Sequence, residues 1–319
     1  MEILTCILVF LFSFIVLFWS SNFILEILKK IAKFLSWKEF VVAFLTIAFA
    51  TTIPNLIIDV ISAINGVPQL ALADVFGTNI VDLTLIVGLS ALVSRAGLSL
   101  SSRTVQMSAF FTVGVAILPL LLIFDNNLSR GDGILLLSAF IFYLGWLFQK
   151  KERFEKIYDK INEPLSRLYF LKNLFLLVFS TIFLLLAGQG VVKSTVFLSK
   201  YFNLPLVFFG VLLVGFMNAL PELTFTFQAA RKSQDWFIAG NVMGSVIMTS
   251  TLCLGIVALI FPFEIPNLTT LAIARSFLLF VSLLFLIFIK TDKKITQTEG
   301  LCLLCIYVLF LLIEVSLKH

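Results

Sequence analysis

Apolar runs long enough to cross a membrane recur along all 319 residues, and this pattern leaves few folds open. A helix needs about 20 apolar residues to span a bilayer, whereas a barrel strand needs about ten residues that alternate in polarity. The runs here do not alternate, and 36 phenylalanines lie among their Leu, Ile and Val residues. The chain is therefore predicted to be an all-α polytopic membrane protein.

Two stretches of the chain are degraded copies of each other, offset by 167 positions, the difference between Pro54 and Pro221. The same gap-free offset pairs Gly77 with Gly244. Each copy carries Pro, Gly, Thr, Asn and carboxylates inside apolar sequence, where polar groups are costly unless they line a cavity. Interrupted segments at matching places in two halves of a membrane protein indicate a transporter's substrate site.

We expect ten transmembrane helices, at about 3–25, 38–65, 69–93, 104–124, 133–149, 169–192, 204–231, 235–262, 267–289 and 299–316. Five helices fall in each half. Because five is odd, the second half enters the membrane in the opposite sense, and the duplication becomes a pair of inverted-topology five-helix repeats. The expected parts are a first half (1–149, with its α-repeat at about 45–93), a linker loop (150–168) and a second half (169–319, with its α-repeat at about 212–260).

The basic residues divide by membrane side. Seventeen of the 23 Lys and Arg residues lie on alternate loops, within 29–38, 95–103, 150–167, 231–232 and 290–294. The positive-inside rule then places these loops and the linker in the cytosol and both termini outside, in a plasma or inner membrane. The net charge of +5 reflects these loops, so we expect no nucleic-acid partner, and no obligatory protein partner is evident.

Four acids lie within the repeat helices: Asp59, Asp74, Asp82 and Glu222. A carboxylate at the helix centre costs about 2.5 kcal/mol or more to insert, so each should face a cavity, a cation or a proton. Each repeat also holds a mid-span proline, which frees carbonyls of the preceding turn. Carboxylates, hydroxyls and carbonyls together form the all-oxygen environment that hard cations such as Ca²⁺ prefer.

Helical spacing groups the candidate metal ligands by face. They are Thr51, Thr52, Asn55, Thr78 and Asp82 in the first repeat, and Asn218, Glu222, Ser245 and Thr249 in the second. Two of these, Asp82 and Glu222, are carboxylates. They can balance one divalent ion, two monovalent ions, or one ion and one proton, so charge alone leaves the cargo open. We expect Asp59 and Asp74 to form an outer access path; the alternative for Asp74 is a solvated acid at a helix start.

The motifs around these residues resemble the α-repeats of the sodium/calcium exchanger superfamily of cation antiporters. In the second repeat, NALPELTFTF carries a Pro-Glu pair at Pro221 and Glu222, and MGSV carries Gly244 and Ser245. In the first repeat, ATTIPNLIID and FGTNIVD match through Pro54, Gly77 and Asn79, among others. The resemblance implies a broken helix and a following helix in each repeat, with cations enclosed between the repeats at mid-membrane.

This chain departs from the family pattern at several site positions. The first-repeat Glu of the family is Asn55 here, and a position that is often Asn is Asp82. Thr249 stands where many relatives carry an acid or an amide, and Asn218-Ala219 replaces a Thr-Ser pair. The resemblance therefore implies the fold, whereas the departures fall on positions that would select the ion.

The expected function is secondary active cation antiport, with Na⁺/Ca²⁺ exchange by alternating access as the first choice. The transported ions are then Ca²⁺ and Na⁺, with H⁺ or another cation as alternatives, and no cofactor is expected. A transport-inactive cation-binding protein is a further alternative. We expect no enzyme, because the sequence has no GxGD or phosphate-loop motif and its one histidine is the last residue, His319.

Overall fold

The computed structural model describes residues 2–34, 39–94, 97–149, 167–265 and 271–317. The first half contains α1 (Ile3–Phe34), α2 (Glu39–Ile64), α3 (Gln69–Val81) with η1 (Asp82–Ile86) and α4 (Val87–Val93), α5 (Arg103–Leu122) with η2 (Ile123–Asp125), and α6 (Arg130–Phe148). The second contains α7 (Arg167–Phe202), α8 (Leu206–Phe209) with η3 (Gly210–Val214), α9 (Gly215–Asn218) and α10 (Leu220–Arg231), α11 (Asp235–Ile247) with η4 (Met248–Cys253) and α12 (Leu254–Ile260), α13 (Ala272–Asp292), and α14 (Gln297–Ser316).

These elements form ten helical rods, and the expectation of an all-α membrane protein is confirmed. Within the described ranges, 9 helices are long and apolar enough to cross a membrane, and α2 contributes a shorter apolar stretch, Thr52–Ile64. Two rods are longer than predicted. α1 continues to Phe34 and α7 to Phe202, where Asn203 adopts a left-handed conformation (φ 53°) that ends the helix.

Helix ends repeat at the same offset of 167 positions. Ser129 and Thr296 each form a capping box, with Asp132 and Glu299 respectively, at the start of α6 and α14. The residues three positions before them, Asn126 and Lys293, both take left-handed conformations, with φ of 64° and 53°. The duplication therefore extends beyond the two motif-bearing stretches to the last helix of each half.

The two halves are interlocked at both ends of the bundle. β1 (Leu98–Ser99) pairs with β4 (Lys294–Ile295), and β2 (Asn127–Leu128) pairs with β3 (Phe263–Glu264), so each ladder joins one half to the other. Between the ladders, a Cβ added to Gly88 of α4 would lie 2.7 Å from the Gly300 carbonyl of α14. Each half thus packs its last helices against the repeat helices of its partner half.

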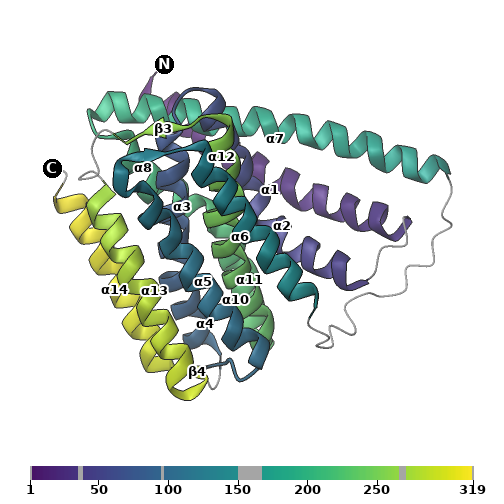
Figure 1. Ribbon diagram of the computed structural model, residues 1–319. Helices are drawn as coiled ribbons and strands as arrows, with labels where there is room; N and C mark the ends of the chain where they lie inside the picture. The colour runs from purple at the N-terminus through teal and green to yellow at the C-terminus, as the bar shows by residue number, and fades with distance from the viewer. Residues whose placement is uncertain (1, 35–38, 95–96, 150–166, 266–270, 318–319) are drawn as a thin grey trace.

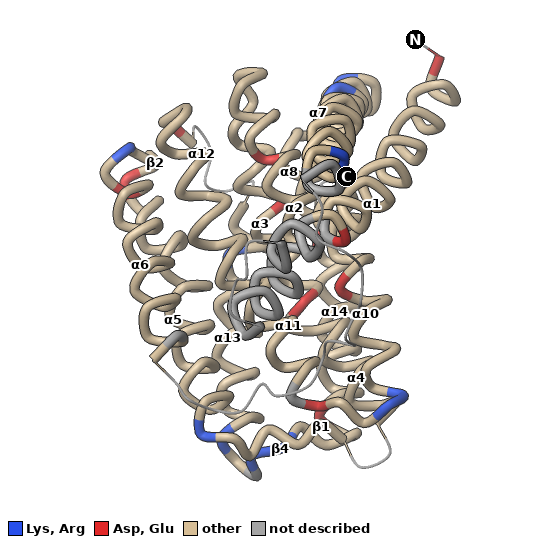
Figure 2. The backbone as a smooth tube through the Cα atoms, turned by 90° about the vertical axis from the view of Figure 1, so that its right-hand side faces the viewer, with Lys and Arg blue, Asp and Glu red and all other residues tan. Residues whose placement is uncertain are grey.

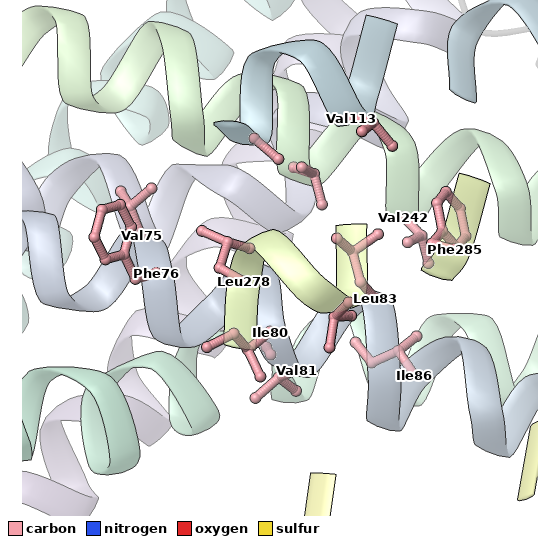
Figure 3. Close-up of a cluster of buried hydrophobic side chains, with 14 of the residues drawn as sticks. Val75, Phe76, Ile80, Val81, Leu83, Ile86, Val113, Val242, Leu278 and Phe285 are labelled. Carbon is pink, nitrogen blue, oxygen red and sulfur yellow. The ribbon is translucent and has the colours of Figure 1, made fainter. Parts of the chain in front are cut away.

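The second helix of each repeat lies at the centre. The window Gln69–Val93 is 83% buried and Phe237–Ile260 is 78% buried, whereas Ile3–Ile24 is 28% buried. Figure 3 shows the apolar face of the first of these, with Phe76, Ile80 and Leu83 beside Leu278 and Phe285 of α13. This packing fixes the helix that also carries Asp74, Thr78 and Asp82 on other faces.

Two long helices, α1 and α7, pack along each other and extend away from this central block (Figure 1). Their outward faces carry exposed large side chains such as Phe12 and Phe175, as expected for a surface in lipid. Lys and Arg gather at the ends of the bundle, whereas Asp and Glu also occur midway along it (Figure 2). Most of the predicted linker, 150–166, lies outside the described residues, so the cytosolic placement of that loop stays a prediction.

Candidate functional site

The two proline-containing helices differ in continuity. In the second repeat the helix is interrupted at Ala219, between α9 and α10, and Pro221 lies in the first turn of α10. In the first repeat Pro54 lies inside α2, which continues from Glu39 to Ile64. The expected break is therefore present in the second repeat, whereas the first repeat keeps one continuous helix through its proline.

The partner helix of each repeat contains a π-helical segment at matching positions. η1 begins at Asp82, and η4 spans Met248–Cys253, which includes Thr249. A π-turn inserts an extra residue into the helical ladder and redirects nearby side chains, which is frequent at functional sites. In the matched turns the Thr84 hydroxyl donates to the Ile80 carbonyl and the Thr251 hydroxyl to the Ile247 carbonyl.

Close backbone approach brings the repeats together around Gly77. A Cβ at Gly77 would overlap the carbonyl of Val211 in η3, and one at Gly215 would lie 2.7 Å from the Thr78 nitrogen. Two glycines thus let α3 and the interrupted helix touch backbone to backbone. The contact places the Gly215 carbonyl within 3.3 Å of the Thr78 hydroxyl, which donates to it.

Asp74 joins α3 to the end of α9. Its Oδ2 accepts from Asn218 Nδ2 at 2.6 Å, and its Oδ1 accepts from the Thr78 hydroxyl at 3.1 Å. Asp74 is fully buried, so the alternative of a solvated helix-start acid is wrong. The sequence position near the Gly66–Gln69 turn suggested exposure, but η3 and α9 of the other repeat cover this part of α3.

Asn79 links the two repeats near the π-helical segments. Its Nδ2 donates to Ser250 Oγ at 2.8 Å, and its Oδ1 lies 2.8 Å from the Thr249 hydroxyl, which can donate to it. Sequence reasoning omitted Asn79 and Ser250 from the candidate ligands. The place of Asn79 in the FGTN motif could have identified it, whereas Ser250 is directed toward Asn79 by the π-helical turn of η4, which the sequence did not predict.

Ser245 connects the two predicted carboxylate ligands. Its hydroxyl lies 3.4 Å from Glu222 Oε1 and can donate to it, and the Asp82 carboxyl of the neighbouring repeat lies near the same serine. Asp82 and Glu222 are both fully buried. The structure therefore brings one acid from each repeat to a shared serine inside the protein.

Several buried polar atoms of the repeat helices have no geometric hydrogen-bond partner among the described residues. They include both carboxylate oxygens of Asp82, both amide atoms of Asn55 and Asn218 Oδ1. An unpaired buried polar atom costs about 1–3 kcal/mol, and a buried charge costs more. Unpaired oxygens from both repeats are the groups that a bound cation would satisfy.

The remaining predicted ligands are placed as follows. Thr52 on α2, Thr78 on α3 and Thr249 on η4 are buried, each at most 1% exposed, whereas the side chain of Thr51 lies outside the described part of the chain. Asp59, assigned with Asp74 to an outer access path, is fully buried as well. The arrangement can hold a cation by oxygen atoms from α2, η1, α9, α10 and α11.

Both halves of the chain match a known protein family. The family model described as sodium/calcium exchanger protein matches residues 5–149 and 172–315, one match for each half. This chain belongs to the sodium/calcium exchanger family. It is therefore a multi-pass membrane transporter for cations, and not an enzyme.

Individual relatives cover nearly the whole chain. A protein of Methanosarcina acetivorans named sodium/calcium exchanger MaX1 is 27% identical, over 96% of this chain and 97% of its own length. The putative antiporter CaxA of Alkalimonas amylolytica is 22% identical over 93% of this chain and 95% of its own. Among solved structures, the sodium-calcium exchanger NCX_Mj superposes with a TM-score of 0.63 at 24% identity, covering 97% of this chain and 98% of the other. The last likeness confirms the fold.

Proposed function

We propose that this protein is a secondary antiporter that exchanges Ca²⁺ against Na⁺ at the buried site between Asp82 and Glu222. The observation that carries the proposal is the set of unpaired buried oxygens that the two repeats contribute, together with Ser245, which contacts the Glu222 carboxyl. Two carboxylates supply the charge that neutralises one divalent ion, and amide and hydroxyl oxygens complete its coordination. The sodium/calcium exchangers among the relatives support this choice of ions.

Exchange follows from competition for one buried set of ligands. Because Asp82 and Glu222 are fully buried, an ion can reach them only after helices move. In the empty site no cation offsets the charge of the two buried carboxylates, which disfavours the occluded form through which the protein changes its open side. Binding of Ca²⁺ or Na⁺ removes that cost, so the bundle changes its open side mainly when it is loaded.

The helices that move are proposed to be α1 and α7. They pack along each other and against α2, and they lie beside the central block rather than inside it (Figure 1). With both termini outside, as the basic loops predict, the pair would slide across α2 and expose the site to one side at a time. The membrane would be a plasma or bacterial inner membrane, which matches the name of one relative, the inner membrane protein YrbG of Escherichia coli.

A second candidate is exchange of a cation against H⁺, or of other mono- and divalent cations, at the same site. It is favoured by Asn55 and Thr249, which leave the centre with two carboxylates where related exchangers have more acidic or amide ligands. Fewer fixed charges favour cargo of lower total charge. Both candidates use the same residues and differ in the gradient that drives them.

Flux into proteoliposomes tests these assignments. The purified protein is reconstituted and ⁴⁵Ca²⁺ uptake is measured first with an imposed Na⁺ gradient and then with a pH gradient. The proposal expects Na⁺-dependent uptake that is lost in Glu222→Gln and in Asp82→Asn. Uptake driven by the pH gradient alone supports the second candidate. Uptake that ignores both gradients and survives both substitutions contradicts the antiporter site.

A further inference from the structure

A second pair of buried acids lies beside the central site. Asp59 follows Asn55 by four residues on α2, and Asp74 precedes Thr78 by four residues on α3. Four residues of helix rise about 6 Å, so the pair lies one turn away from the central ligands, toward the ends of α2 and α3 that meet at the Gly66 turn. Both side chains are fully buried, and their carboxyls interact with each other.

The oxygens of this pair are unevenly satisfied. Asp74 accepts from Asn218 and Thr78, whereas the carboxyl of Asp59 meets Asp74 and accepts no geometric hydrogen bond from any other described residue. Asn218 Oδ1 is also unpaired, although the same amide group is held against Asp74 by its nitrogen. A fully buried carboxyl and a buried amide oxygen, from the two residues that contact Asp74, thus lack a donor from any other described residue.

The surroundings of the pair supply no positive charge. The described groups that interact with the two acids are each other, Thr78, Asn218 and the thiol of Cys253. Two carboxylates in contact away from water repel each other and lose their hydration. A bound cation between them would reduce the repulsion and replace part of the lost hydration.

The second repeat shows that the fold does not require these acids. The positions that match Asp59 and Asp74 are Thr226 and Asn241. Thr226 donates to the Glu222 carbonyl of its own helix at 2.7 Å, as an ordinary buried threonine does. The same helix pair is therefore built without acids in one repeat and with two buried acids in the other.

We infer that Asp59, Asp74 and Asn218 form a second cation-binding site, specific for a monovalent metal cation such as Na⁺, on one side of the central site. This inference rests on the proposed function, because it adds an ion to the cargo of the Asp82–Glu222 site. The few oxygens available favour a monovalent ion, since Ca²⁺ takes about 6–8 oxygen ligands. Asn218 contributes to the second site by both amide atoms: its nitrogen holds Asp74, and its unpaired oxygen is available to a cation.

Equilibrium binding to the purified protein in lipid nanodiscs tests this site. Bound ²²Na⁺ and ⁴⁵Ca²⁺ are counted per protein for the wild type, for Asp59→Thr combined with Asp74→Asn, and for Glu222→Gln. The double variant installs the residues that the second repeat carries at the same positions. Thermal unfolding shows whether each variant folds. If the double variant does not fold, the single variant Asp59→Asn, which keeps the shape of the side chain, replaces it in the binding measurement.

The double variant should bind one fewer ²²Na⁺ per protein and keep more of its ⁴⁵Ca²⁺ binding than Glu222→Gln does. Glu222→Gln should lose ⁴⁵Ca²⁺ binding but keep the ²²Na⁺ that depends on Asp59. Unchanged ²²Na⁺ stoichiometry in the folded Asp59 variants would overturn the second site, whatever happens at Glu222. If the wild type binds no ⁴⁵Ca²⁺ but shows ²²Na⁺ binding that depends on Asp59, the calcium assignment fails and the second site stands.

Discussion

In the first repeat, three of the buried polar side chains are acids: Asp59, Asp74 and Asp82. The matching positions of the second repeat hold Thr226, Asn241 and Thr249, and its one buried acid, Glu222, matches Asn55. The second helix of each repeat has a similar backbone, because both carry a π-helical segment at matching positions, whereas the proline-containing helix is continuous in the first repeat and interrupted in the second. Helix packing therefore holds the backbone of each copy, while the charges that meet the ion differ between the copies.

The largest expected effect comes from removing one acid of each repeat. Asp82→Asn and Glu222→Gln should each weaken ⁴⁵Ca²⁺ binding on the order of 100-fold, because each removes a charged ligand of the central site. Asp125→Asn, at an exposed helix end, is the matched control and should bind normally. If only one of the two central variants loses binding, the ion is held by one repeat, and the shared site is wrong.

The next effect concerns the close contact that joins the repeats. Gly77→Ala should lower the free energy of unfolding by about 1–3 kcal/mol, because the added methyl group overlaps the Val211 carbonyl. Gly240→Ala is the control: its added Cβ meets nothing within 4 Å, and the matching position of the first repeat is already Ala73. Thermal unfolding in detergent compares the two, and equal stability would show that α3 and η3 do not pack as described.

Making the repeats more alike in charge should change ion preference. Asn55→Glu places an acid opposite Glu222 at the matching position, and a third central carboxylate favours divalent over monovalent cations. We expect the ratio of Ca²⁺ to Na⁺ affinity to rise by about tenfold, which corresponds to about 1.4 kcal/mol. Competition of Na⁺ against bound ⁴⁵Ca²⁺ measures the ratio, and a fall in the ratio for the folded variant would remove Asn55 from the site.

The smallest expected effect concerns the helix N-caps of α6 and α14, which are of the same kind in both halves. Ser129→Ala and Thr296→Ala each remove an N-cap of the same kind, and each should cost about 1 kcal/mol of stability. The two losses should agree, because the capping boxes lie at matched positions of α6 and α14. A loss at only one of them, measured by thermal unfolding, would show that the matched caps contribute unequally.

Much of the fold could be predicted from the sequence because it depends on apolar length and on the duplication. The ten rods, and the ends of α2 and α14 to within about two residues, follow from apolar runs and breakers such as Pro and Gly. The ends of α1 and α7 could not, since both helices continue past their apolar spans into stretches that contain lysines, Lys29 and Lys30 in α1 and Lys193 in α7. The continuity of α2 through Pro54 was also hidden, because a proline can either interrupt or merely bend a helix.

The predicted site residues depended on pattern, and the missed ones depended on three-dimensional contacts. Spacing from the prolines and glycines selected Asp82, Glu222 and Ser245, which the structure brings together. It could not show that Asp74 is covered by α9, because that contact joins residues 144 positions apart. Ser250 could not be predicted for a similar reason: the sequence pattern of a regular helix does not show that a π-turn will direct the Ser250 side chain toward Asn79.

The central claim is that oxygens from both repeats hold one cation inside the protein. Anomalous X-ray scattering from a crystal grown with Sr²⁺, a divalent ion of the same class as Ca²⁺, tests it most directly. We expect an anomalous peak bounded by Asp82, Glu222 and Ser245, and no such peak in Glu222→Gln. A wild-type crystal with Sr²⁺ at other positions only, or with a peak at this point that persists in Glu222→Gln, would contradict it.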